Sequence, residues 1–298
     1  MKTGFGCVLG LVLAAVHVAP SAHAQPTACA TRTGGDGPRI EEAAFVPLGG
    51  IEQFVTIRGD DRANPVLLHV HGGPGIAFSA FAADFAPYEA DFTVVQWDQR
   101  GAGCTFGRNG EGPELTLDRL AGDGVELARH LRGRLGGTKM VVLGHSFGSI
   151  VATEMVRRAP EQFSLYVGTG QFGSFAGNLD SQIAHLRASA AGDADLLAQL
   201  AAIDALDSRS TQKFGAVNRL VQSRMPAVDV SFMQGLQARA AALMGAQALA
   251  DWQAGRQASG NRLIQQVAGV DLFASAPRLA VPFVVIQGSD DHITPTTC

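Results

Sequence analysis

The sequence predicts an α/β protein with a mostly parallel sheet, helices on both faces of that sheet and an inserted block of helices. Two observations predict this class. Short apolar runs alternate with stretches of helical periodicity, and the runs at 139–144, 164–170 and 282–288 are nearly unbroken, as in strands buried on both faces. Between about 171 and 270 such runs are absent.

The first half of the chain is expected to supply most of the sheet. Strands are predicted at 53–59, 65–73 and 92–101, because each of these apolar runs ends in a glycine-rich turn. A helix is predicted within 115–135, where leucines recur on one helical stripe. The polar, glycine-rich segment 31–42 is interpreted as a lead into the first of these strands.

The segment 171–270 is expected to form a helical cap. Leu196, Leu200 and Ile203 recur at helical spacing, and Leu236 and Ala240 do the same further on. An all-helical block between two core strands is most simply a lid over one end of the sheet. The predicted division is therefore a core over 40–170, this cap, and the second part of the core over 271–298.

Residues 1–24 are predicted to be a signal peptide. Lys2 supplies the positive charge, an apolar run covers 7–19, and Ser-Ala-His-Ala before Gln25 fits a small-residue cleavage site. The run is short for the ~20 residues that a membrane-spanning helix needs. Cleavage, export to the periplasm or outside the cell, and no stable membrane insertion afterwards are expected.

Composition and cysteine content exclude several classes of protein. A net charge of -4 and a pI near 6.0, without runs of like charge, argue against binding to nucleic acid. After signal cleavage Cys29, Cys104 and Cys298 remain, which allows one disulfide whose pairing stays open. No cysteine spacing fits a zinc site, and no metal or cofactor is expected. The oligomeric state is left open.

The stretch Gly-His-Ser-Phe-Gly at 144–148 carries the strongest chemical signal. It is a G-x-S-x-G motif that follows a predicted strand and precedes an apolar helix, which is the context that the motif requires. Gly144 and Gly148 allow a tight turn with Ser146 at its apex, above the positive end of the helix. Ser146 is therefore the candidate nucleophile.

The stretch His-Gly-Gly-Pro-Gly at 71–75 predicts a place for a developing negative charge. Its glycines free backbone amides that can point at an oxyanion, together with the amide of the residue after the nucleophile. Gly73 and Phe147 are assigned these two roles. His71 ends the preceding strand and is expected to shape the loop.

The stretch Trp-Asp-Gln-Arg-Gly at 97–101 is expected to be structural. Asp98 and Arg100 are interpreted as a local ion pair that fixes a loop beside the pocket, because arginine does not act as a base and no metal ligands accompany Asp98.

These three motifs, in this order, resemble the proline iminopeptidase-like family of serine hydrolases, which has the α/β-hydrolase fold. The resemblance covers about 42–295 and is weak in the helical block. It implies a Ser–Asp–His triad, an oxyanion hole at the 71–75 loop, an inserted cap, no cofactor, and a small peptide or acyl compound as substrate.

The same resemblance assigns the acid of the triad. In the family pattern G-x-x-D-x-x-T-P, Gly288, Asp291, Thr294 and Pro295 align, so Asp291 is the expected acid and Asp290 the alternative. The order Ser…Asp…His places the histidine later in the chain, after one further strand.

The triad histidine is not found in this chain. His145 precedes the serine and is expected to point away from the pocket, and His292 adjoins the acid too closely to relay a proton. His130 lies on a helix flank, and His185 alone is placed to reach the pocket, from the cap. The expectation is that the last strand and helix of the core lie beyond residue 298.

The composition of the predicted cap is a second departure from the family. Proline iminopeptidases are thought to hold the free amine of the substrate with glutamates of the cap, whereas no glutamate follows Glu161 here. Two alternatives to an aminopeptidase therefore stay open. The protein is an esterase or amidase on the same scaffold, or a catalytically impaired protein that keeps the fold.

Overall fold

The computed structural model describes residues 28–208 and 210–295, so the predicted signal peptide and Cys298 lie outside the described residues. Seven strands form one sheet in the order β1-β2-β4-β3-β5-β6-β7. The strands are β1 (Ile40–Leu48), β2 (Ile51–Gly59), β3 (Val66–Val70), β4 (Thr93–Trp97), β5 (Met140–His145), β6 (Phe163–Thr169) and β7 (Phe283–Ile286).

The sheet is mostly parallel, as predicted. β1 and β2 pair antiparallel, β2 pairs antiparallel with β4, and every pairing from β4 through β3, β5 and β6 to β7 is parallel. β3 and β4 are buried along their whole length, which agrees with their mostly apolar sequences. The carboxyl ends of the parallel strands therefore meet at one edge, where a site is expected in an open α/β sheet.

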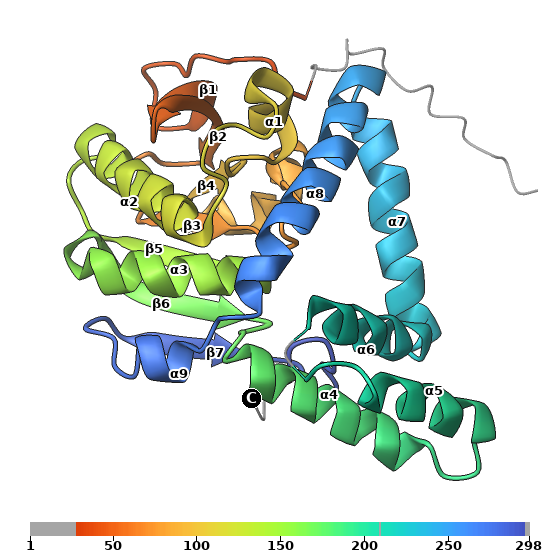
Figure 1. Ribbon diagram of the computed structural model, residues 1–298. Helices are drawn as coiled ribbons and strands as arrows, with labels where there is room; N and C mark the ends of the chain where they lie inside the picture. Colours follow the sequence, from red (N-terminus) through yellow and green to blue (C-terminus); the bar gives the residue numbers. More distant parts are fainter. Residues whose placement is uncertain (1–27, 209, 296–298) are drawn as a thin grey trace, which may run out of the picture.

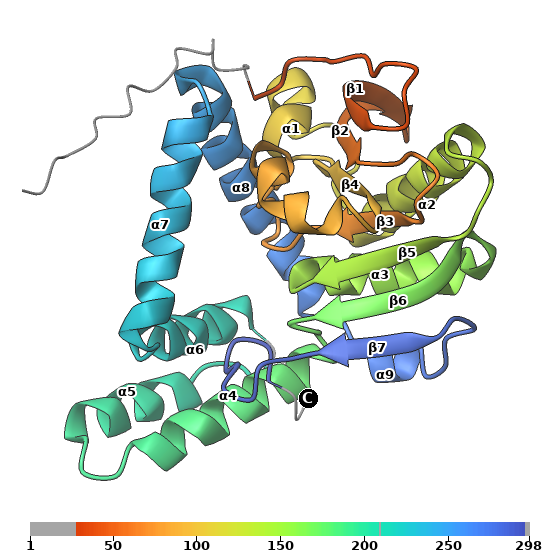
Figure 2. The same cartoon turned by 180° about the vertical axis from the view of Figure 1, so that it is seen from behind.

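Helices cover both faces of the sheet. α2 (Leu117–Arg134) and α3 (Phe147–Arg158) lie on one face, and the 3₁₀ segment η1 (Ser79–Tyr88) lies on the other (Figures 1 and 2). The remaining short elements are α1 (Gly103–Asn109), η2 (Pro160–Gln162) and α9 (Leu272–Ser275). α2 begins where Thr116 accepts a hydrogen bond from the Arg119 amide, a side-chain N-cap.

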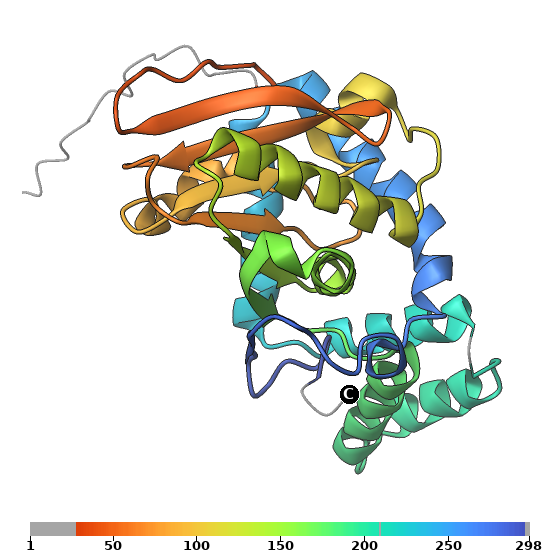
Figure 3. The ribbon, with the colours of Figure 1, turned by 90° about the vertical axis from the view of Figure 1, so that its left-hand side faces the viewer.

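In the described part of the interval predicted to be a helical block there are five helices. They are α4 (Phe175–Ser189), α5 (Ala194–Asp204), α6 (Thr211–Ser223), α7 (Ala227–Leu243) and α8 (Ala246–Val267). α4 and α5 lie at the end of the sheet opposite to β1 (Figures 1 and 3). α7 and α8 run as a long hairpin beside the carboxyl ends of the strands (Figures 1 and 2). The division into domains stays a prediction.

The first strand was not predicted. The structure places β1 within and beyond the segment interpreted as a polar lead, and β1 pairs with β2 along its whole length, from Ile40 opposite Gly59 to Leu48 opposite Ile51. β1 is only partly buried, so its sequence lacks the apolar run that marks the inner strands.

A disulfide joins Cys29 to Cys104, with an S–S distance of 2.07 Å. It attaches the segment before β1 to α1 and resolves the pairing that the sequence left open. In the described part of the chain, no helix is long and apolar enough to cross a membrane.

Candidate active site

Ser146 lies in the sharp turn between β5 and α3. Its backbone has φ 52° and ψ -125°, a left-handed conformation that an ordinary residue adopts only under strain. The Ser146 amide donates to the Thr169 carbonyl on the neighbouring strand, and its carbonyl accepts from the Ser149 amide. The turn predicted from the G-x-S-x-G motif is therefore present, with a half-exposed serine at its apex.

The two glycines of the motif are required by close packing. A Cβ atom on Gly148 would lie 2.1 Å from the Val70 carbonyl oxygen, and one on Gly144 would lie 2.9 Å from the Ser149 Cα. Any side chain at either position would push the turn away from β3 or from its own helix. The glycines thus allow the turn to sit directly at the strand ends.

The 71–75 loop lies immediately beside the serine. A Cβ atom on Gly72 would be 3.0 Å from the Ser146 Cβ, and Gly73 has φ 123°, a conformation that favours glycine. Among the described residues, neither the Gly73 amide nor the Phe147 amide has a hydrogen-bond acceptor. Two unpaired donors beside a nucleophile are the arrangement that stabilises an oxyanion.

His71 holds this loop in place rather than facing a substrate. Its Nδ1 is 3.0 Å from the Gly72 carbonyl oxygen, and its Nε2 accepts from the Gln99 amide at 3.3 Å. The side chain is 1% exposed, and burial lowers the pKa of His71 to about 3. The neutral ring therefore braces the loop, in the shaping role that the sequence suggested.

The predicted ion pair between Asp98 and Arg100 is wrong. Arg100 instead pairs with Asp123 of α2, with Nε 2.9 Å from Oδ2, and both side chains are buried. Asp98 accepts hydrogen bonds from the Ser79 hydroxyl at 2.8 Å and the Cys104 amide at 2.9 Å. The two residues face different elements, so each fixes a separate part of the loop.

Asp98 has no cationic partner among the described residues, which affects its charge. Burial raises the pKa of Asp98 to about 6, even though the hydrogen bonds from Cys104 and Ser79 favour the ionised form. Asp98 links Ser79 of η1 to Cys104 of α1, and this placement indicates a structural role.

Asp291 lies in the loop after β7 (the acid loop, residues 287–295). Its Oδ1 accepts from the amides of Ile293 and Thr294, both at 2.9 Å, and its Oδ2 accepts from the Thr294 hydroxyl at 2.7 Å and Gln287 Nε2 at 2.8 Å. Asp290 is exposed and has no hydrogen bond in the described part of the chain. The carboxylate held in a fixed orientation is thus that of Asp291.

The acid loop and the serine turn meet at Gly170, at the end of β6. A Cβ atom on Gly170 would lie 3.1 Å from the Thr294 hydroxyl oxygen and 3.6 Å from the Ser146 amide nitrogen. Thr294 in turn is bonded to Asp291. The structure therefore brings the candidate nucleophile and the candidate acid to the same edge of the sheet, on neighbouring turns.

Two amide side chains of the cap hold the acid loop, and sequence reasoning missed both. Asn178 donates to the Ile293 carbonyl at 2.9 Å, and Gln182 donates to the carbonyls of Ile293 at 3.0 Å and His292 at 3.1 Å. Both side chains are almost fully buried. Their signal in the sequence is a polar pair four residues apart on the apolar face of α4, which alone does not reveal the partner.

The histidines of the described residues make no hydrogen bond to Ser146 or Asp291. His145 Nδ1 lies 3.1 Å from the Thr169 hydroxyl, and the rings of His185 and His292 stack with centroids 3.5 Å apart. His185 of the cap thus contacts the acid loop, and its ring packs against that of His292. No group of three or more histidine, cysteine or acidic side chains suited to a metal is found within residues 28–208 and 210–295.

Residues 65–297 match the sequence family described as alpha/beta hydrolase fold. The chain belongs to this family. The predicted fold class and the fold implied by the three motifs are therefore confirmed, since the parallel strands β3 to β7, the serine turn and the acid loop all lie within the matched residues.

One curated relative of this α/β hydrolase is a probable aminopeptidase of Bacillus subtilis (strain 168), YbaC. The two are 33% identical over 125 residues, which is 42% of this chain and 39% of the relative. The match thus spans about two fifths of the relative's length.

Two solved structures share the fold of this α/β hydrolase. A proline iminopeptidase-related protein of Thermus thermophilus is 24% identical with a TM-score of 0.57, covering 86% of this chain and 82% of that protein. VinJ is 21% identical with a TM-score of 0.58, covering 88% and 86% of the two chains.

Proposed function

We propose that this α/β hydrolase is a serine hydrolase that releases N-terminal residues from peptides by acyl transfer through Ser146. The observation that carries the proposal is the placement of Ser146 in a strained turn, beside two amides without acceptors. The aminopeptidase name of the Bacillus relative and the motif resemblance to proline iminopeptidases support the peptide substrate. Whether proline is preferred depends on the cap.

The proposed roles follow from the geometry. The Ser146 hydroxyl attacks the carbonyl carbon of the substrate, and the amides of Gly73 and Phe147 stabilise the oxygen that becomes negative. Asp291 orients a base that takes the serine proton and returns it to the leaving amine. Among the described residues no histidine is bonded to Asp291 or Ser146, so these side chains do not supply that base.

A second candidate function is an esterase or amidase that does not require a free amine. The absence of glutamate after Glu161 favours it, because the resemblance to proline iminopeptidases implies cap glutamates that bind the free amine of the substrate. We also propose that the protein is exported. The Cys29–Cys104 disulfide supports this compartment, since such bonds persist in oxidising surroundings.

The nucleophile is tested with a fluorophosphonate probe on the wild type and two variants. Labelling is expected for the wild type, to vanish in Ser146→Ala and to persist in Ser189→Ala, a serine at the far end of α4. Labelling that survives in Ser146→Ala would refute the assignment. Comparing prolyl arylamide with a short acyl ester then separates the two candidate functions, because only the aminopeptidase requires the free amine.

A further inference from the structure

Helix α8 packs directly on the 71–75 loop. A Cβ atom on Gly75 would lie 2.9 Å from the Arg256 Cα and 2.8 Å from the Ser259 Cβ, so backbone meets backbone at this point. Trp252, one turn earlier, donates from its indole to the Ala77 carbonyl at 3.0 Å. This stretch of α8 therefore forms a wall beside the predicted oxyanion donors.

Arg256 lies on the face of α8 that meets the core, yet it is exposed. At 100° per residue, Arg256 is about 40° around the helix from Trp252 and about 20° from Leu263. Trp252 and Leu263 are 3% and 1% exposed, whereas Arg256 is open to solvent. A side chain on the inward face that stays open to solvent projects into space beside the loop, not into the core.

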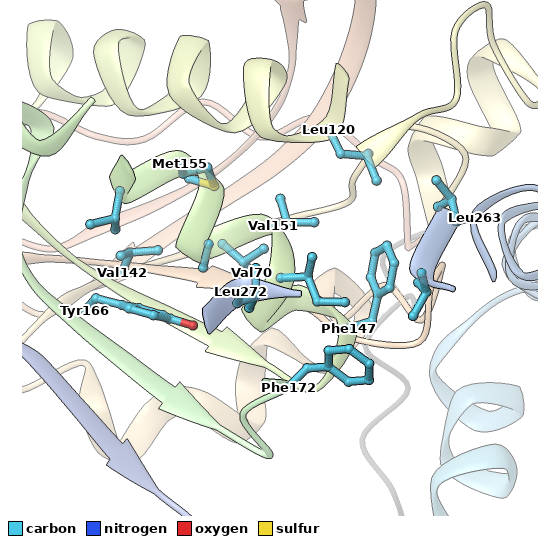
Figure 4. Packing of buried hydrophobic residues seen from close by; sticks show 14 of the residues in the cluster. Val70, Leu120, Val142, Phe147, Val151, Met155, Tyr166, Phe172, Leu263 and Leu272 are labelled. Carbon is cyan, nitrogen blue, oxygen red and sulfur yellow. The ribbon is translucent and has the colours of Figure 1, made fainter. Parts of the chain in front are cut away.

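Phe147, the residue after the candidate nucleophile, lies next to α8. Phe147 and Leu263 belong to one buried cluster, and Phe147 points toward α8 (Figure 4). The turn of α8 that carries Arg256 contacts the 71–75 loop, and Leu263, two turns further along the same helix, lies on the side toward which Phe147 points (Figure 4).

Arg256 has no ionic partner among the described residues, which distinguishes it from its neighbours. Arg262 on the same helix pairs with Glu111, and Arg239 on α7 pairs with Asp84. An exposed cation without a carboxylate of its own is available to an anionic ligand, and the fork of a guanidinium fits a carboxylate.

We propose that Arg256 is a specificity-determining residue that binds a carboxylate of the substrate. This inference rests on the proposed function and names its substrate class. In a peptide substrate, the bound group is the C-terminal carboxylate. The peptide is short, because this carboxylate must lie close to the bond that is cleaved. For an ester substrate, the same chemistry is met by an acid ester such as a glutarate half-ester.

Binding is measured by calorimetry on Ser146→Ala protein, so that no turnover interferes. One ligand pair is prolyl-glycine and prolyl-glycinamide, and a second is monomethyl glutarate and its neutral amide. Each pair differs in one carboxylate. The free acid of at least one pair is expected to bind about tenfold more tightly than its amide, as for a hydrogen bond to a charged group.

Two variants in the same background assign the effect. Arg256→Gln is expected to abolish the preference for the acid, and Arg262→Gln, which removes a paired arginine from the other flank of α8, is expected to keep it. A preference that is absent, or that survives in Arg256→Gln, would overturn the inference. Discrimination in the glutarate pair alone, without peptide binding, would retain the carboxylate site and reject the aminopeptidase.

Discussion

The Gln182 side chain of α4 donates to the Ile293 carbonyl at 3.0 Å, so a helix of the cap region holds the loop that carries Asp291. Asn178, one turn earlier, donates to the same carbonyl at 2.9 Å. The orientation of the candidate acid thus depends on residues more than a hundred positions away in the chain. A displacement of α4 is therefore expected to disturb the loop that carries Asp291.

Replacing Gln182 by leucine is expected to loosen the acid loop. The change leaves two partly buried carbonyls with fewer donors, which costs about 1 kcal/mol of unfolding free energy. Hydrogen exchange of residues 288–295 should accelerate while exchange in β3 is unchanged. Gln199→Leu, on the exposed side of α5, is the control, and equal acceleration in both variants would contradict the link.

A methyl group at Gly148 is expected to be severely destabilising. It would lie 2.1 Å from the Val70 carbonyl oxygen, so α3 must move away from β3, at a cost of about 3 kcal/mol. Gly133→Ala is the matched control, because that glycine lies in α2 with nothing within 4 Å of its Cβ position. There alanine should stabilise the helix by up to ~1 kcal/mol. Urea unfolding of both variants measures the contrast, and similar effects of the two substitutions would refute it.

Stability is expected to fall as the pH drops from about 6.5 to 4. Burial lowers the pKa of His69 to about 4 and that of His71 to about 3. Below pH 6.5 the two histidines therefore bind more protons in the unfolded chain than in the folded one. At pH 4 each histidine then lowers the free energy of unfolding by on the order of 3 kcal/mol.

Asp98 acts in the opposite direction over the same range. Its pKa of about 6 lies above the unfolded value of 3.8, so protonation favours the folded state as the pH falls from 6 to 4. Asp98→Asn removes this gain and should steepen the loss of stability. Denaturant midpoints at pH 7, 6, 5 and 4 test the sign, and an unchanged slope in the variant would contradict the account.

Opening the disulfide is expected to lower the unfolding free energy by about 2–4 kcal/mol. Cys29 and Cys104 are 75 positions apart, and closing so long a loop restricts the unfolded chain substantially. The melting temperature of the wild type should fall in reductant, whereas that of Cys29→Ser should not. Cys298→Ser should behave as the wild type does. A reductant-sensitive Cys29→Ser protein would point to another pairing.

The sequence predicted those parts of the fold whose physical cause is local. β3, β5, β6 and β7 are short apolar runs, and the Ser146 turn follows from glycines at fixed spacing. β1 was missed because it is partly exposed and takes its register from β2.

Side-chain partners were much less predictable. Arg100 bonds to Asp123 rather than to Asp98, because the loop turns the two side chains toward different elements. The contacts of Asn178 and Gln182 depend on where the cap region meets the acid loop. No spacing within the sequence encodes that meeting.

β7 sets the position of the acid loop relative to the serine turn. It pairs with β6 in parallel, with Ile286 opposite Thr169. A slip of one residue in this register would turn every side chain of β7 to the other face of the sheet. The loop that carries Asp291 is therefore placed by the pairing of one short strand with β6, whose last residue, Thr169, accepts a hydrogen bond from the Ser146 amide.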